Sequence, residues 1–148
     1  MMSDSERQIV CTNCAALNRL PPDRDALAAR CGKCRTPLFS GQPADVDSRM
    51  FARQIGRNSI PVLVDVWAPW CGPCRMMAPE FARAARSLEP SMRLVKLNSE
   101  SEQATAASLG IRGIPTLLLF HHGHELARQA GAMDAAAIAA WARSQLRN

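Results

Sequence analysis

Six cysteines occur as three pairs with the spacing Cys-x-x-Cys, and this spacing is the clearest chemical signal in the sequence. Two cysteines three positions apart can bind one metal ion together, or they can cycle between a dithiol and a disulfide. In a reducing compartment such pairs are typical of metal ligands and redox catalysts rather than structural disulfides. The pairs are Cys11 with Cys14, Cys31 with Cys34, and Cys71 with Cys74.

The two N-terminal pairs predict a metal site. Sixteen residues separate Cys14 from Cys31, which is within the range found in zinc ribbons. Each pair forms a tight turn that directs two thiolates at one point, and two turns complete the tetrahedral sulfur shell that suits Zn²⁺. Because no coordination position stays open, we expect one structural zinc ion per chain, bound by Cys11, Cys14, Cys31 and Cys34. The spacing also leaves open iron, two redox pairs or disulfides, and oxidation that ejects the metal.

The third pair is expected at the junction of a strand and a helix. A β-branched apolar run over residues 60–67 predicts a buried strand, and helical periodicity extends from Cys71 to about Leu88. At a helix N-terminus, unpaired N–H groups and the macrodipole favour a thiolate, so the pKa of Cys71 should lie below its usual ~8.5. Cys74 lies one turn later on the same face and can resolve a mixed disulfide at Cys71. Pro73 is tolerated in the first helical turn.

Alternating helical and strand patterns after residue 47 predict an α/β domain with three layers. In this region Met76 and Met77 are expected to pack in the core, and Ser99 with Glu102 resembles a capping box. The chain divides into a small cysteine-rich module (1–38), a linker or first short strand (39–47) and the α/β domain (48–148). The other expected elements are helices over 48–57, 99–110 and from 134 onward, and strands over 92–97, 116–120 and 125–129.

Composition and charge argue against several classes of function. The chain has 148 residues, of which 47% are hydrophobic and 21% charged, as in a folded globular protein. A net charge of +5 is spread along the sequence, which argues against a nucleic-acid partner. No apolar run approaches the ~20 residues that span a bilayer. The polar start does not resemble a secretory signal, so we expect a cytoplasmic protein without a membrane partner.

Several separated segments resemble the thioredoxin family in order and spacing, over about residues 43–146. They are VLVDVWAPWCGPCRMMAP (62–79), VKLN (95–98), GIRGIPTL (110–117) and the Gly131-Ala132 pair before the last helix. The N-terminal module is similar to the ribbon of zinc-containing thioredoxins of the thioredoxin 2 type. The resemblance implies the thioredoxin fold, a central mixed sheet flanked by helices, with a small N-terminal zinc ribbon.

The resemblance also implies roles for single residues. Cys71 matches the family's attacking nucleophile and Cys74 its resolving thiol. Asp65 matches a buried carboxylate that assists proton transfer at the second cysteine, and burial should raise its pKa. Lys96 matches a lysine near that carboxylate, and Pro115 matches the family's cis-proline. The residues that match the substrate-binding surface are Trp70, Gly72, Pro73, Gly113, Ile114 and Gly131.

The implied function is reduction of disulfides in protein substrates. The chain would bind no organic cofactor itself, and a partner thioredoxin reductase that uses NADPH and FAD would recharge it. One alternative is a disulfide oxidant or isomerase, although Gly72-Pro73 resembles the reducing members. Another is a zinc-dependent binding or redox-regulated chaperone module carried by a thioredoxin domain. His121, His122 and His124 are expected in a solvated turn rather than a second metal site.

Overall fold

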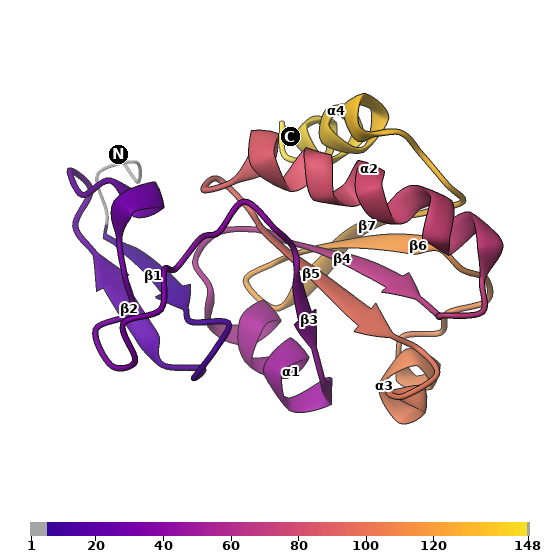
Figure 1. The fold of residues 1–148 in the computed structure, drawn as a ribbon, viewed down its shortest axis with the longest axis horizontal. Helices are drawn as coiled ribbons and strands as arrows, with labels where there is room; N and C mark the ends of the chain where they lie inside the picture. Colours follow the sequence, from indigo (N-terminus) through magenta and orange to yellow (C-terminus); the bar gives the residue numbers. More distant parts are fainter. Residues whose placement is uncertain (1–5, 148) are drawn as a thin grey trace.

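The chain folds into a small N-terminal module that lies beside a larger α/β domain (Figure 1). The computed structural model describes residues 6–147. In the small module, β1 (Arg7–Val10) and β2 (Leu17–Leu20) form an antiparallel hairpin, followed by a short 3₁₀ helix (Ala26–Ala28). The buried cluster of this module contains Ile9, Leu38 and Phe39, and also Ile60 from the larger domain. The two parts therefore share apolar packing.

The larger domain is built around a five-stranded mixed sheet in the order β3-β5-β4-β6-β7. β3, β5 and β4 are parallel, and β6 and β7 are antiparallel to their neighbours. The strands are β3 (Ala44–Val46), β4 (Val62–Trp67), β5 (Arg93–Asn98), β6 (Thr116–His121) and β7 (His124–Ala130). The helices are α1 (Ser48–Arg57), α2 (Gly72–Leu88), α3 (Gln103–Ser108) and α4 (Ala135–Gln145). β3 falls within residues 39–47, where the sequence allowed a linker or a short strand.

Helices cover both faces of the sheet, as Figure 1 shows, with α2 and α4 on one face and α1 and α3 on the other. Side chains alternate between the faces along each strand. Leu63 accordingly packs in the cluster with α2 and α4, whereas Val64 and Val66 pack in the cluster with α1. The same alternation places Asp65 on the α2 face. The predicted fold class, a mixed sheet flanked by helices, is confirmed.

Two helix starts agree with the sequence and one does not. Asp47 caps α1 by accepting a hydrogen bond from the Met50 N–H at 2.8 Å, and Asp134 caps α4 through the Ala137 N–H at 2.8 Å. The expected capping box at Ser99 and Glu102 is wrong. The helix begins at Gln103, and Glu102 makes no side-chain cap hydrogen bond. Its carboxylate accepts hydrogen bonds from the backbone N–H and hydroxyl of Ser48 instead.

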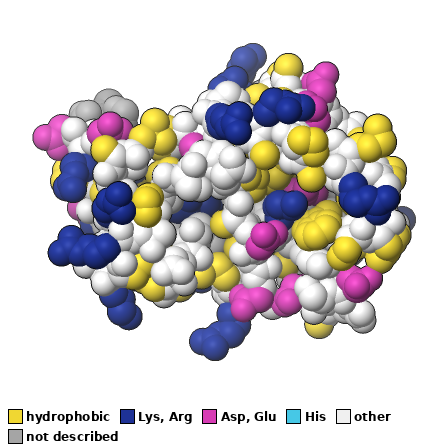
Figure 2. Space-filling model, in the orientation of Figure 1, with side chains coloured by type: hydrophobic (Ala, Val, Ile, Leu, Met, Phe, Trp, Pro, Cys, Tyr) yellow, Lys and Arg dark blue, Asp and Glu magenta, His cyan; other side chains and the backbone are white. Residues whose placement is uncertain are grey.

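Charged side chains are distributed over both parts of the molecule. On the face drawn in Figure 2, basic and acidic groups are interspersed rather than gathered by sign. Within residues 6–147, no helix has the length and apolar character needed to cross a membrane.

Candidate redox site and metal centre

Cys71 forms the N-cap of α2, directly after the turn that follows β4. Its Sγ accepts a hydrogen bond from the backbone N–H of Cys74 at 3.2 Å. A disulfide joins the two cysteines, whose Cα atoms are 5.2 Å apart. Both are buried, with 5% of Cys71 and 2% of Cys74 exposed. The sequence thus correctly located the pair at a strand-to-helix junction, and the structure holds it in the oxidised form.

The loop before β6 lies against the cysteine pair. The Ile114–Pro115 peptide bond is cis. The carbonyl oxygen of Ile114 lies 3.8 Å from the sulfur of Cys71, and the Ile114 side chain packs against the cluster formed by Ala68 and the two cysteines. The carbonyl of Pro115 accepts a hydrogen bond from the N–H of Gly131 at 2.9 Å. The structure therefore places Ile114 against the redox pair and holds Gly131, from a separate loop, beside Pro115.

Most residues expected to contact a substrate lie at the surface. Trp70 is 67% exposed, which is high for an indole side chain. Pro73, Gly113 and Gly131 are also exposed, and Gly72 is half-buried. A flat aromatic ring and several small residues therefore lie at the surface near the cysteine pair.

Met76 is a surface residue that the sequence analysis assigned wrongly. It is 74% exposed, whereas Met77 is buried as expected. Met76 lines a groove of about 310 Å³ with Glu80 on α2 and with Ala132 and Met133 before α4. Helical periodicity alone could not separate the two methionines, because adjacent positions on α2 face opposite environments.

Asp65 is almost completely buried, with 1% exposed, and neither carboxylate oxygen has a hydrogen-bond partner among the described residues. Burial raises the pKa of Asp65 to about 7, and the nearby charge of Lys96 opposes that rise. A carboxyl group with this pKa can gain or lose a proton near neutral pH. Asp65 lies on the face of the sheet that α2 covers, and α2 is the helix that carries Cys74.

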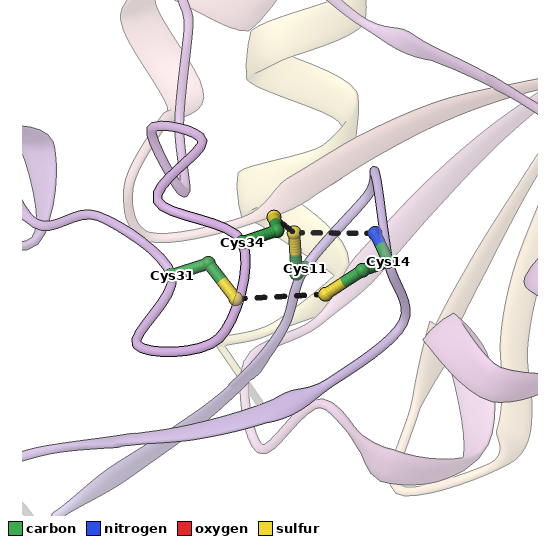
Figure 3. A group of neighbouring side chains, drawn as sticks. All are labelled: Cys11, Cys14, Cys31 and Cys34. Atoms are coloured by element: carbon green, nitrogen blue, oxygen red, sulfur yellow. Dashed lines mark hydrogen bonds between the residues drawn. The ribbon is translucent and has the colours of Figure 1, made fainter.

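The four N-terminal cysteines converge on one point (Figure 3), and their sulfur atoms all lie within 4.8 Å of one another. Sulfur–sulfur distances are 3.6 Å for Cys11 with Cys34 and 3.6 Å for Cys14 with Cys31. Zinc–sulfur bonds of about 2.3 Å in a tetrahedron place sulfur atoms about 3.8 Å apart. The arrangement therefore fits a tetrahedral ion, and it is the sole cluster of three or more such ligands among residues 6–147.

Polar groups surround these sulfur atoms in a way that suits thiolates. The backbone N–H groups of Asn13 and Lys33 donate to Cys11 and Cys31 at 3.3 and 3.4 Å. The side chain of Asn18 donates to Cys31 at 3.5 Å and accepts from the N–H of Gly32 at 2.9 Å. Hydrogen bonds of this kind fix ligand orientation in metal sites. Sequence spacing predicted that the four cysteines would converge, but it gave no sign of the contacts made by Asn18.

The thiol pKa values differ within the cluster. The side chain of Asn13 and a hydrogen bond with Thr36 lower the pKa of Cys34 to about 5, whereas burial raises the pKa of Cys11 to about 11. Metal binding requires thiolates, so binding at Cys11 must release a proton. Outside this cluster, the ring of His121 stacks on that of His122, with centroids 4.0 Å apart.

Comparison with known proteins agrees with this site. The thioredoxin family model matches residues 42–144. The chain is 38% identical to thioredoxin C-3 of Corynebacterium nephridii, over 93% of this chain and 94% of that protein. It is 43% identical to a thioredoxin of Haemophilus influenzae, over 60% of this chain and 83% of that protein. A mutant thioredoxin from Halobacterium salinarum superposes with a TM-score of 0.66 at 29% identity, covering 74% of this chain and 96% of that one.

The chain belongs to the thioredoxin family. Membership assigns it to the thiol–disulfide oxidoreductases. Thioredoxins are in general reduced by thioredoxin reductase and act on disulfide substrates. The C. nephridii alignment covers 93% of this chain, so it must include most of residues 1–38. The H. influenzae alignment is limited to 60% of the chain. Similarity at the N-terminal module is therefore a property of some of these relatives and not all.

Proposed function

We propose that this chain is a protein-disulfide reductase in which Cys71 and Cys74 react with the substrate, and that its N-terminal cysteines hold one structural zinc ion. The observation that carries the redox part is the Cys71–Cys74 disulfide at the N-terminus of α2, in contact with the loop at Ile114. A nucleophile at this position is favoured by the positive end of the helix macrodipole. Family membership supplies the reaction class.

In the first step, the thiolate of Cys71 attacks one sulfur of a substrate disulfide. A new sulfur–sulfur bond forms to Cys71, the substrate bond breaks, and the other substrate sulfur leaves as a thiolate and takes a proton from water. The N–H of Cys74, which donates to the sulfur of Cys71 in the oxidised protein, is available to stabilise its negative charge. An extended substrate could pair with the backbone at residue 114 while contacting Trp70.

In the second step, Cys74 loses its proton and its sulfur attacks the sulfur of Cys71. The Cys71–Cys74 disulfide forms, the mixed disulfide breaks, and the second substrate sulfur leaves as a thiolate. Two electrons have then passed from the protein dithiol to the substrate. We assign Asp65 the role of accepting the Cys74 proton, because it is buried on the α2 face and its pKa is raised to about 7.

The reducing direction needs a source of electrons. We infer that a partner thioredoxin reductase returns the disulfide to the dithiol, and that NADPH and FAD act within that partner. The Gly72-Pro73 dipeptide between the cysteines, which resembles the reducing members of the family, supports this direction over oxidation or isomerisation. A reducing cytoplasm would also keep the N-terminal thiols available for metal.

Zinc is the ion that the N-terminal cluster fits best. Four thiolates arranged within 4.8 Å match a closed tetrahedral site, so the ion would stabilise the module and take no part in the redox steps. When bound, it would hold Cys11, Cys14, Cys31 and Cys34 as thiolates, and the proton of Cys11 would be released. The basic side chains of Arg30, Lys33 and Arg35 lie in the same segment and offset the negative charge of such a centre.

Insulin reduction with thioredoxin reductase and NADPH tests the redox part. The wild-type chain should accelerate insulin precipitation and NADPH consumption, and Cys71→Ser should abolish both, because serine has no accessible anion at neutral pH. Ala52→Ser, at an exposed position of α1, is the matched control and should behave as wild type. A Cys71→Ser protein as fast as wild type would disprove the assignment. Metal analysis of the purified chain tests the zinc part separately.

A further inference from the structure

Val10, the residue before Cys11, has both backbone polar groups bonded to side chains of the larger domain. Its N–H donates to Oδ1 of Asn58 at 2.7 Å. Its carbonyl accepts from Nη2 of Arg93 at 2.9 Å and from Nε2 of Gln54 at 3.3 Å. These three side chains are polar or charged, and each is at most 2% exposed. Hydrogen bonds on both sides of Val10 therefore fix the position of Cys11 relative to the end of α1 and to β5.

Arg93 also holds the segment that leaves the second cysteine pair. Its Nη1 donates to the carbonyl of Leu38 at 2.8 Å, and its guanidinium lies over the ring of Phe39, 4.4 Å from the centroid. Burial lowers the pKa of Arg93 to about 10, so the group stays charged at neutral pH. One cation thus joins the end of β1, next to Cys11, to Leu38 at the end of the cysteine module.

The side chains of Asn58 and Gln54 also contact each other at the end of α1. The side-chain amide nitrogen of Asn58 donates to the side-chain oxygen of Gln54 at 2.6 Å and to its backbone carbonyl at 3.0 Å. The next residue, Ser59, exchanges backbone and hydroxyl hydrogen bonds with Gln8 of β1. These bonds dock one strand of the small module onto the larger domain.

We propose that Arg93, Asn58 and Gln54 are positioning residues of the metal centre, and that metal binding is therefore coupled to the stability of the thioredoxin domain. The inference rests on the metal part of the function proposed above. Without metal, Cys11 keeps the backbone hydrogen bonds of its own turn but loses the bond that ties it to the second cysteine pair, so Val10 is freer to leave its partners. The buried groups of Arg93, Asn58 and Gln54 then lose their partners, which is costly unless the interface opens to water. The coupling is reciprocal: metal binding stabilises the thioredoxin domain, and the folded thioredoxin domain strengthens metal binding.

The chain itself supplies a selective reporter. Its three tryptophans, Trp67, Trp70 and Trp141, all lie in the larger domain. Tryptophan fluorescence therefore follows unfolding of the thioredoxin domain, whereas a zinc chromophore competition assay follows the cysteine module. Both are measured on the full-length chain at fixed reductant, with zinc present and after removal by a strong chelator.

Chelation should lower the tryptophan-reported midpoint of the wild-type chain by at least about 5 °C. Arg93→Met should lower zinc affinity about tenfold or more, as loss of groups that orient metal ligands does elsewhere, and should shrink the chelation shift. Arg93→Lys keeps the charge but cannot reach both carbonyls in the same fork, so it should not restore affinity. Arg57→Met removes an exposed arginine and should leave both measurements unchanged.

If Arg93→Met does not fold, Asn58→Ala replaces it, because it removes the acceptor of the Val10 N–H and the two hydrogen bonds to Gln54 but leaves Arg93 in place. A wild-type chain that binds zinc but unfolds at the same temperature with and without it would overturn the coupling. Wild-type zinc affinity in both Arg93→Met and Asn58→Ala would overturn the positioning role. A wild-type chain that binds no zinc would overturn both the metal site and this inference. Insulin reduction, measured in parallel, reports separately on the redox function.

Discussion

Asp65 and Lys96 are opposite each other in the parallel register of β4 and β5, yet the ammonium group of Lys96 lies over the indole ring of Trp67, 4.6 Å from its centroid. The carboxylate of Asp65 has no hydrogen-bond partner among the described residues. Because the lysine lowers the pKa of Asp65 less than burial raises it, the pKa reaches about 7. The lysine therefore moderates the proton affinity of the carboxyl group without forming an ion pair with it.

Asp65→Asn should stabilise the protein at high pH and leave its stability nearly unchanged at low pH. The pKa of Asp65 rises from 3.8 to about 7 on folding, so the folded state holds the proton more tightly than the unfolded state. Stability from this group is complete below about pH 4 and is lost as pH rises through about 7. One pKa unit corresponds to about 1.4 kcal/mol, so we expect a gain of about 2–4 kcal/mol at pH 8.5. Denaturant unfolding at pH 4 and pH 8.5 measures it.

A constant stability difference between wild type and Asp65→Asn across this pH range would contradict the burial of an ionisable carboxyl group. Asp45→Asn is a suitable control. It lies beside Lys96 in the register of β3 and β5 but is exposed.

Lys96→Met should raise the pKa of Asp65 further, because the substitution removes the one charge that opposes desolvation. The loss of stability with rising pH would then begin at the same pH but extend to a higher one. Titration of the Asp65 carboxyl carbon by NMR in both proteins measures the shift directly. An unchanged pKa would mean that the charge of Lys96 is screened from Asp65, and a lowered pKa would contradict the assigned effect of Lys96 on Asp65.

Cys74→Ser should trap substrates on Cys71. The first step of disulfide exchange needs the Cys71 thiolate alone, whereas release needs a second sulfur in reach. Incubation with a disulfide-bonded protein, followed by non-reducing electrophoresis and mass spectrometry, should show a covalent adduct at Cys71. Cys71→Ser is the matched control and should give no adduct. Adducts of equal yield in both variants would show that either cysteine can attack.

Brief alkylation of the reduced protein should modify Cys71 well before Cys74. Cys71 precedes the first turn of α2, where its thiolate is stabilised, and Cys74 is the less exposed of the two. Peptide mapping after a short exposure to iodoacetamide gives the order. Faster labelling of Cys74 would reverse the assignment of nucleophile and resolving thiol.

Removal of residues 1–38 should leave a folded domain that binds no zinc at stoichiometric level and still reduces insulin. The two large apolar clusters on either side of the sheet lie entirely within residues 46–146. The fragment should nevertheless unfold at a lower temperature than the full-length chain, because Ile60 loses its apolar contacts with the cysteine module and Arg93 loses its hydrogen bond to Leu38. On the fragment, circular dichroism tests folding, metal analysis tests zinc binding, and the insulin assay tests activity. A folded fragment without activity would place part of the redox site in the cysteine module.

Local chemistry explains what could be predicted from the sequence. The starts of the helices predicted over 48–57 and from 134 onward were predictable, because the cap that fixes each start bonds an N–H only three positions away. The convergence of the four N-terminal cysteines was equally predictable from their spacing within and between two short turns. Glu102 was misassigned because Ser48, its actual partner, is 54 positions away.

Tertiary packing explains what the sequence could not reveal. Arg93 begins a strand, and its charge gave no sign that it would be buried between two modules. Its partners at Val10 and Leu38 lie 83 and 55 positions away. The exposure of Met76 beside a buried Met77 likewise depends on which face of α2 meets the sheet.

The short strand β3 determines where this chain can be cut without harming its behaviour in solution. β3 pairs through Ala44–Val46 with Val95–Leu97 and so covers the outer edge of β5, a strand whose side chains are mostly buried. Uncovered edges of apolar strands pair with strands of other molecules and seed aggregates. A fragment that begins at residue 39 keeps this edge covered. One that begins at residue 48 would expose β5 and should self-associate, even though every residue of the redox site is present.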